Sequence, residues 1–89
     1  MHFQFRTQGV CAKQIDFDLD DSGKVRNIAF WGGCNGNLKA ISKLVDGWTP
    51  QEISAKLRGN TCGNKPTSCA DQLAIAVMQA DAARSKAEE

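Results

Sequence analysis

The feature that most constrains this 89-residue chain is its set of four cysteines, Cys11, Cys34, Cys62 and Cys69. A domain of this size buries only about 60 to 65% of its unfolded-chain surface, so its core is thin and a cross-link would help it fold. Each cysteine falls in a loop or at the predicted end of a strand or helix. Cysteines that pack as small apolar side chains are expected on buried stripes instead. The placement therefore favours metal ligation.

The surroundings of the cysteines support the same interpretation. Glycines at positions 9, 33, 36 and 63 flank the first three, and their backbone freedom helps to turn sulfur atoms toward one point. Cys69 lies at the predicted start of a helix, where the helix dipole favours a thiolate, the form that binds metal. We therefore predict one four-thiolate site for zinc or an iron-sulfur cluster, without a preference between them.

Two other interpretations of the cysteines remain open. The chain lacks the paired Cys-x-x-Cys motifs of a zinc ribbon, and only Cys62 and Cys69 are close in sequence. A dithiol or disulfide arrangement is the first alternative, and cysteines without a chemical role are the second.

Charge and hydropathy restrict the partners and the location. Eleven Lys plus Arg residues oppose ten Asp plus Glu residues, a net charge of +1 that argues against nucleic acid or an anionic membrane as a partner. The longest apolar run, residues 73–78, is far shorter than the roughly 20 residues that cross a bilayer. Because the N-terminus also lacks the pattern of a secretory signal, we expect a cytoplasmic protein. In a reducing cytosol, cysteines more often serve as metal ligands or redox groups than as structural disulfides.

Alternation of apolar and polar residues predicts three strands, over residues 3–7, 15–19 and 25–31. The sequence Asp20-Asp21-Ser22-Gly23 has turn chemistry, so the second and third strands should form a hairpin. Residues 18–23, Asp-Leu-Asp-Asp-Ser-Gly, also imitate the first half of a calcium loop, but Ala29 stands at the twelfth position, where such a loop needs a glutamate. The alternation slips at Arg26-Asn27, which predicts a β-bulge.

Helical spacing follows the strands. A first helix is expected to have its N-cap at Asn37 and to end at Gly47. The sequence Thr49-Pro50-Gln51-Glu52 has the spacing of a capping box with proline at the first helical position, so a second helix should run to about Leu57. Gly59 should end it.

A third helix should be capped by Thr67 or Ser68 and bury one face. That face comprises Leu73, Ala76, Val77 and Ala80. The order of elements predicts an α+β fold, a single two-layer domain in which a three-stranded antiparallel sheet is followed by three helices packed on one face. We expect this cysteine metal-binding domain to cover residues 1–81, and residues 82–89 to form a frayed helix end or tail.

One segment carries a family resemblance. Residues 59–73, GNTCGNKPTSCADQL, resemble the signature of the TSCPD domain family. Residues 32–38, GGCNGNL, and the early Cys11 also resemble that family's pattern, so the resemblance extends to about Met78. Ala70 stands where the name-giving motif has proline, a departure that should cost rigidity at the helix start more than ligation.

The resemblance implies a cysteine-bearing accessory module. Members of the family occur alone and as a segment attached to adenosylcobalamin-dependent ribonucleotide reductases, so a ribonucleotide reductase or another protein is the implied partner. We expect no enzyme activity from the chain alone, because 89 residues cannot supply a radical-enzyme barrel, a cobalamin site and a nucleotide site. The loop that carries Cys34 also resembles the cysteine loop of NifU-type iron-sulfur scaffolds.

Three hypotheses for the function follow. The first is a metal-binding accessory module with all four cysteines as ligands. The alternative is a dithiol redox protein in which Cys62 and Cys69 deliver electrons to a reductase such as ribonucleoside-diphosphate reductase. A third is nucleotide sensing, because backbone amides of residues 32–37 could cradle a phosphate, although this loop matches neither the P-loop nor the dinucleotide fingerprint.

Overall fold

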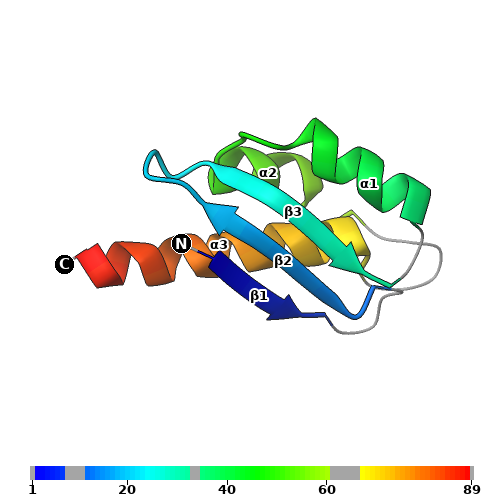
Figure 1. The fold of residues 1–89 in the computed structure, drawn as a ribbon, viewed down its shortest axis with the longest axis horizontal. Helices are drawn as coiled ribbons and strands as arrows, with labels where there is room; N and C mark the ends of the chain where they lie inside the picture. The colour runs from blue at the N-terminus through cyan, green and yellow to red at the C-terminus, as the bar shows by residue number, and fades with distance from the viewer. Residues whose placement is uncertain (1, 8–11, 33–34, 61–66, 89) are drawn as a thin grey trace.

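A three-stranded sheet and three helices make up the chain, and the computed structural model describes residues 2–7, 12–32, 35–60 and 67–88 (Figure 1). The three strands come first along the chain and the three helices follow, as the sequence predicts. In order, the elements are β1 (His2–Arg6), β2 (Gln14–Leu19), β3 (Val25–Trp31), α1 (Asn35–Leu44), α2 (Pro50–Leu57) and α3 (Cys69–Glu88).

The sheet is antiparallel, with strand order β1-β2-β3. The predicted hairpin joins β2 to β3, and its turn contains Gly23 at a φ of 79°. The Asp20 carboxylate accepts hydrogen bonds from the amides of Ser22 and Lys24, both at 2.9 Å, so this segment is a hairpin turn and not a calcium loop.

The predicted β-bulge is also present. Asp16 pairs with Ala29 and Asp18 pairs with Arg26, so a step of two residues on β2 faces a step of three on β3. Asn27 lies within the longer step and has a φ of 55°. Asparagine tolerates this left-handed conformation better than most residues, which explains why the strand can accommodate the extra residue here.

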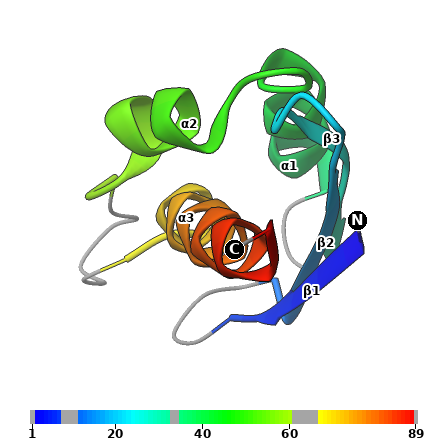
Figure 2. The same cartoon turned by 90° about the vertical axis from the view of Figure 1, so that its left-hand side faces the viewer.

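The helices cover one face of the sheet, as Figure 2 shows in a view along α3. α1 packs against β3, α3 packs against β2, and α2 packs against α3. The core between these layers contains Ile15, Phe17, Leu19, Val25, Val45, Ile53, Leu73, Ala74, Ala76, Val77 and Ala80. The alternation of β2 and the helical face predicted for α3 both point into this core, and the predicted α+β class is confirmed.

The ends of α1 and α2 agree with the sequence signals except at one point. Thr49 and Glu52 form the predicted capping box at the start of α2, and Gly59 follows its C-cap at a φ of 86°. The predicted N-cap of α1 was wrong, because Asn37 lies inside a helix that begins at Asn35. Gly36 costs less in the first turn than in a helix interior, since the first-turn amides have no intrahelical partners.

α3 begins after a serine cap. The Ser68 Oγ accepts a hydrogen bond from the Asp71 amide at 3.1 Å, and the Ser68 carbonyl accepts one from the Gln72 amide at 2.9 Å. Of the two predicted caps, Ser68 therefore fills the role. The helix continues beyond residue 81 to Glu88, and the fraying of this end in solution stays a prediction. Across the described residues, no helix is both long and apolar enough to span a membrane.

Candidate functional site

The predicted site residues differ in how far the structure describes them. Cys69 is the first residue of α3 and is half-buried. Cys11, Cys34 and Cys62 lie outside the described residues. Within the described ranges, no group of three or more His, Cys, Asp or Glu side chains is arranged to hold a metal ion. The described residues that bear on the predicted four-cysteine site are Cys69 and the sequence neighbours of the other three cysteines.

The Cys69 sulfur contacts Ala12, two residues before β2 begins. The amide of Ala12 donates a hydrogen bond to the Cys69 Sγ, with 3.4 Å between nitrogen and sulfur, although 57 positions separate the two residues. Ala12 is only 1% exposed, so this amide has little access to water and needs a partner within the protein. The contact ties the N-terminus of α3 to the segment that follows Cys11 in the sequence.

Near Ala12, the end of β1, the beginning of β2 and the end of β3 lie side by side. Gln14 pairs with Arg6 on one side and with Trp31 on the other. The amide of Lys13 donates to the Trp31 carbonyl at 2.7 Å, and the Thr7 amide donates to the Lys13 carbonyl at 3.3 Å. In Figure 1, the end of β1, the beginning of β2, the end of β3 and the beginnings of α1 and α3 all lie at the right-hand end of the molecule.

The connection from α2 to α3 is closed by a hydrogen bond between its described ends. The Ser68 hydroxyl donates to the Asn60 carbonyl, and the Asn60 side-chain amide lies 3.5 Å from the Ser68 Oγ. Ser68 is 7% exposed and immediately precedes Cys69. The residue before segment 61–66 is thereby held beside the start of α3.

Asp71 also joins the two described ends of the connection between α2 and α3. Its carboxylate, 3% exposed, accepts hydrogen bonds from the Thr67 hydroxyl at 2.5 Å, the Gly59 amide at 2.6 Å and the Arg58 guanidinium at 2.8 Å. The Thr67 hydroxyl, followed by the Gly59 amide and Arg58, lowers the pKa of Asp71 below its usual range. Since both carboxylate oxygens are engaged, Asp71 acts as a positioning residue.

A comparison with protein-family models matches the TSCPD domain to residues 2–81 of the chain. The chain belongs to the TSCPD domain family. No curated protein matches this TSCPD domain significantly, and no solved structure does so.

Two residues of this TSCPD domain were not recognised as part of the site from the sequence. Asp71 was interpreted only through its spacing from a cap, and Arg58 was not considered. The signal that could have found them is the pairing of an acidic residue in the first turn of α3 with a basic residue after α2. Their separation of 13 positions spans a connection whose ends must meet.

Ala70 and Trp31 are two further described residues at this end of the fold. Ala70, which stands in place of the family's proline, is the second residue of α3 and is 5% exposed. Trp31, at the end of β3, is 56% exposed, so it lies on the surface and not in the core.

Proposed function

We propose that this TSCPD domain is a small metal-binding accessory module in which Cys11, Cys34, Cys62 and Cys69 together hold one zinc ion or one iron-sulfur cluster. The single observation that carries the proposal is the hydrogen bond from the Ala12 amide to the Cys69 Sγ. It joins the residue after the first cysteine to the last cysteine. Metal-bound thiolates also accept N–H hydrogen bonds, and such bonds tune the metal.

Covalent geometry extends this argument to the other cysteines. Consecutive Cα atoms are about 3.8 Å apart. Cys11 is bonded to Ala12, Cys34 is bonded to Asn35, and Cys62 follows Asn60 by two positions. Asn35 begins the helix that follows β3, and Asn60 is hydrogen-bonded to Ser68, the neighbour of Cys69. Since these described residues lie at the Cys69 end of the fold, the sequence positions of the other three cysteines support the proposal.

The chemistry of the donor set fits either group. Four thiolates satisfy a tetrahedral zinc ion completely, which is typical of a structural site, and they are also the usual ligands of iron-sulfur clusters. Bound zinc would supply a cross-link, whereas a cluster would supply electron transfer. For a chain of 89 residues with a thin core, either group would also stabilise the fold.

The proposed accessory role is supported by the family and by the exposed surface of Trp31. Members of the family also occur attached to adenosylcobalamin-dependent ribonucleotide reductases, so the proposed partner is a ribonucleotide reductase or another cytoplasmic protein, and neither nucleic acid nor a membrane. Trp31 lies at the Cys69 end of the sheet and offers a large exposed aromatic surface for such a contact. Reducing conditions in the cytoplasm would keep the thiols available for metal.

Metal analysis of the purified protein together with its visible absorption spectrum tests the proposal. We expect about one zinc per chain without colour, or iron with sulfide and a visible absorption band. Each Cys→Ser variant should lower the metal content, because hydroxyl oxygen is a poor substitute for thiolate. A colourless protein without metal, in which all four thiols react freely, would rule the proposal out.

A second candidate function is a dithiol redox protein. The Ser68 hydroxyl bond to the Asn60 carbonyl favours it, because this bond draws the two ends of the Cys62 segment toward Cys69. Cys62 and Cys69 would form a disulfide on oxidation, and two electrons and two protons would pass to a reductase such as ribonucleoside-diphosphate reductase. Reversible oxidation of this pair alone, with Cys11 and Cys34 dispensable for folding and metal content, would favour this function over the first.

A further inference from the structure

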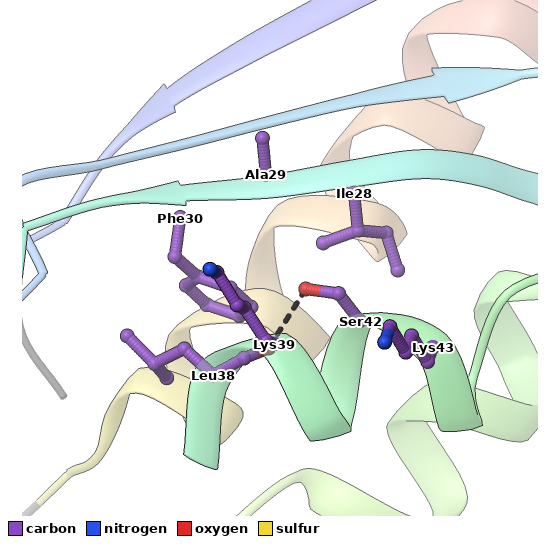
Figure 3. A pocket seen from close by; sticks show the side chains of 7 residues that line it. All are labelled: Ile28, Ala29, Phe30, Leu38, Lys39, Ser42 and Lys43. Carbon is purple, nitrogen blue, oxygen red and sulfur yellow. Dashed lines mark hydrogen bonds between the residues drawn. The ribbon is translucent and has the colours of Figure 1, made fainter. Parts of the chain in front are cut away.

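A groove between β3 and α1 lies apart from the cysteines. It encloses a cavity of about 340 Å³ bordered by residues 28–30 of β3 and by four residues of α1 (Figure 3). Ile28 and Phe30 point from the strand toward the helix, and Leu38 lies opposite Phe30. Leu38 is 6% exposed, and the two strand residues are half-buried. The groove therefore has an apolar floor large enough for at least one side chain.

One wall of the groove is the edge of a sheet. β3 is the last strand in the order β1-β2-β3, and no further strand pairs with it among the described residues. The Ala29 methyl group points away from α1 in Figure 3, so it is the backbone of this residue that borders the cavity. A strand edge presents unpaired amides and carbonyls that can pair with another extended chain.

Contacts with the segment after α1 cover the first part of the β3 edge. Val25 exchanges hydrogen bonds with Gly47 and Trp48 at 2.7 and 2.8 Å, and the Asp46 carboxylate accepts the Asn27 amide at 3.2 Å. These contacts cover the edge as far as Asn27. Among the residues that the structure describes, none covers the outer edge of the stretch from Ile28 to the end of β3 at Trp31. At about 3.3 Å per residue, this stretch matches a short extended segment.

The other wall carries positive charge. Lys39 and Lys43 lie one helical turn apart on α1, both exposed at the rim of the groove. In the described part of the chain, neither lysine forms an ion pair with a carboxylate. Ser42, between them in sequence, turns its hydroxyl back to the Leu38 carbonyl at 2.8 Å and leaves space in the groove. The rim is thus complementary to acidic side chains.

We propose that the groove binds an extended acidic segment of a partner protein, which adds to the free edge of β3 as a fourth strand. Backbone pairing with residues 28–31 supplies affinity, and side chains at alternate positions of the segment face α1. An apolar side chain enters the cavity, and carboxylates two positions before and after it meet Lys39 and Lys43. A free small anion would satisfy the lysines but leave the strand edge unpaired. This inference does not rest on the metal site proposed for the cysteines.

A synthetic peptide with this pattern, acetyl-Thr-Glu-Thr-Val-Thr-Glu-Thr-amide, tests the proposal. Titration of the ¹⁵N-labelled full chain should shift the amide resonances of residues 28–31 and of α1. Two further peptides carry N-methyl groups on one or the other alternate set of residues. One of them should bind at least tenfold more weakly because it loses strand pairing, and the other should bind within about threefold of the parent peptide. Equal binding by both would overturn the proposal.

Variants of the protein test the charge and the cavity. Lys39→Glu/Lys43→Glu should weaken binding about three- to tenfold and should favour the same peptide with lysine in place of glutamate. Lys24→Glu/Lys56→Glu makes the same change in net charge elsewhere and should have a smaller effect.

Ser42→Phe should fill the groove and abolish binding, whereas Ala40→Phe adds the same ring on an exposed position of α1 and should not. Circular dichroism and metal content should match the parent protein in all four variants. No binding at millimolar peptide, shifts outside the groove, or a dimer of the chain formed through this edge would each contradict the inference.

Discussion

The amide nitrogen of Ala12 lies 3.4 Å from the sulfur of Cys69 and donates a hydrogen bond to it, across 57 positions of sequence. This contact joins the segment that leads into β2 to the start of α3. The end of β3 joins the same region through the bond from Lys13 to the Trp31 carbonyl. The fold therefore gathers, at one end of its sheet, the described residues that neighbour the cysteines. Cysteine variants test whether the cysteines bind a metal.

Cys69→Ser should reduce metal affinity by more than about 100-fold, since loss of an outer-shell partner alone typically costs about 10–100-fold. The reason is that one of four proposed thiolates is replaced by a poor ligand. Metal content after dialysis against a graded chelator measures the effect. Ala55→Ser, which adds a hydroxyl at an exposed position of α2, is the control. Full metal retention by Cys69→Ser would show that this sulfur is not a ligand.

Asp71→Asn should destabilise the protein by about 1–3 kcal/mol at neutral pH, because a buried carboxylate loses charge-assisted hydrogen bonds. Urea unfolding measures the loss. The same variant should also retain metal less well, since Asp71 links Thr67 and Gly59 on either side of the Cys62 segment. Asp21→Asn makes the same change of charge on an exposed turn residue and controls for net charge.

The effect of Asp71 should depend on pH in a definite direction. Its folded-state pKa lies below the ordinary value of 3.8, because Thr67, Gly59 and Arg58 stabilise the charged form. The stability that Asp71 contributes is then fully present above pH 3.8 and is lost as the pH falls through the lower, folded-state pKa. The difference between parent and Asp71→Asn should therefore shrink in acid. A difference that grows as the pH falls would contradict the assignment.

Local signals in the sequence predicted most of the fold correctly. The turn at residues 20–23 and the slip at Arg26-Asn27 predicted the hairpin and its bulge, because glycine and asparagine tolerate the left-handed backbone at these points. The start of α1 was misplaced, since Asn35 and Asn37 both suit a helix N-terminus and local chemistry does not distinguish them. α1 also packs against β3, a tertiary contact that local chemistry does not encode.

Thr49→Ala should lower the free energy of unfolding by about 0.5–2 kcal/mol. The Thr49 hydroxyl accepts the Glu52 amide at 3.2 Å, and the Glu52 carboxylate accepts the Thr49 amide at 3.0 Å, so the variant breaks one half of a reciprocal cap. Thr49→Ser keeps the hydroxyl and should remain within about 0.5 kcal/mol of the parent. Thermal unfolding of the three proteins compares them, and equal losses in both variants would show that the cap contributes nothing.

Leu73→Ala should cost about 2–5 kcal/mol, because Leu73 is fully buried in the hydrophobic core and its truncation leaves a cavity. Leu44→Ala is the matched control. Leu44 is 70% exposed, so its truncation should change the free energy of unfolding by no more than about 0.5 kcal/mol. Urea midpoints of the two variants should differ widely, and similar midpoints would contradict the observed packing of α3.

The candidate site was less accessible to prediction than the fold. Periodicity along the chain indicates which residues are buried, but it does not indicate which loop ends meet across 57 positions, as Ala12 and Cys69 do. The roles of Arg58 and Asp71 also depend on a contact between α2 and α3 that no local pattern encodes. The placement of Cys69 at the start of a helix was predicted, because serine capping is a local signal.

X-ray absorption at the metal edge of the purified protein tests the central claim most directly, because it reports the atoms bound to the metal. The account predicts a first shell made of sulfur alone, with four sulfur atoms at about 2.3 Å if the metal is zinc. In an iron-sulfur protein, the shell should contain cysteine and sulfide sulfur with iron neighbours. A first shell of nitrogen or oxygen, or a protein without metal, would contradict the account.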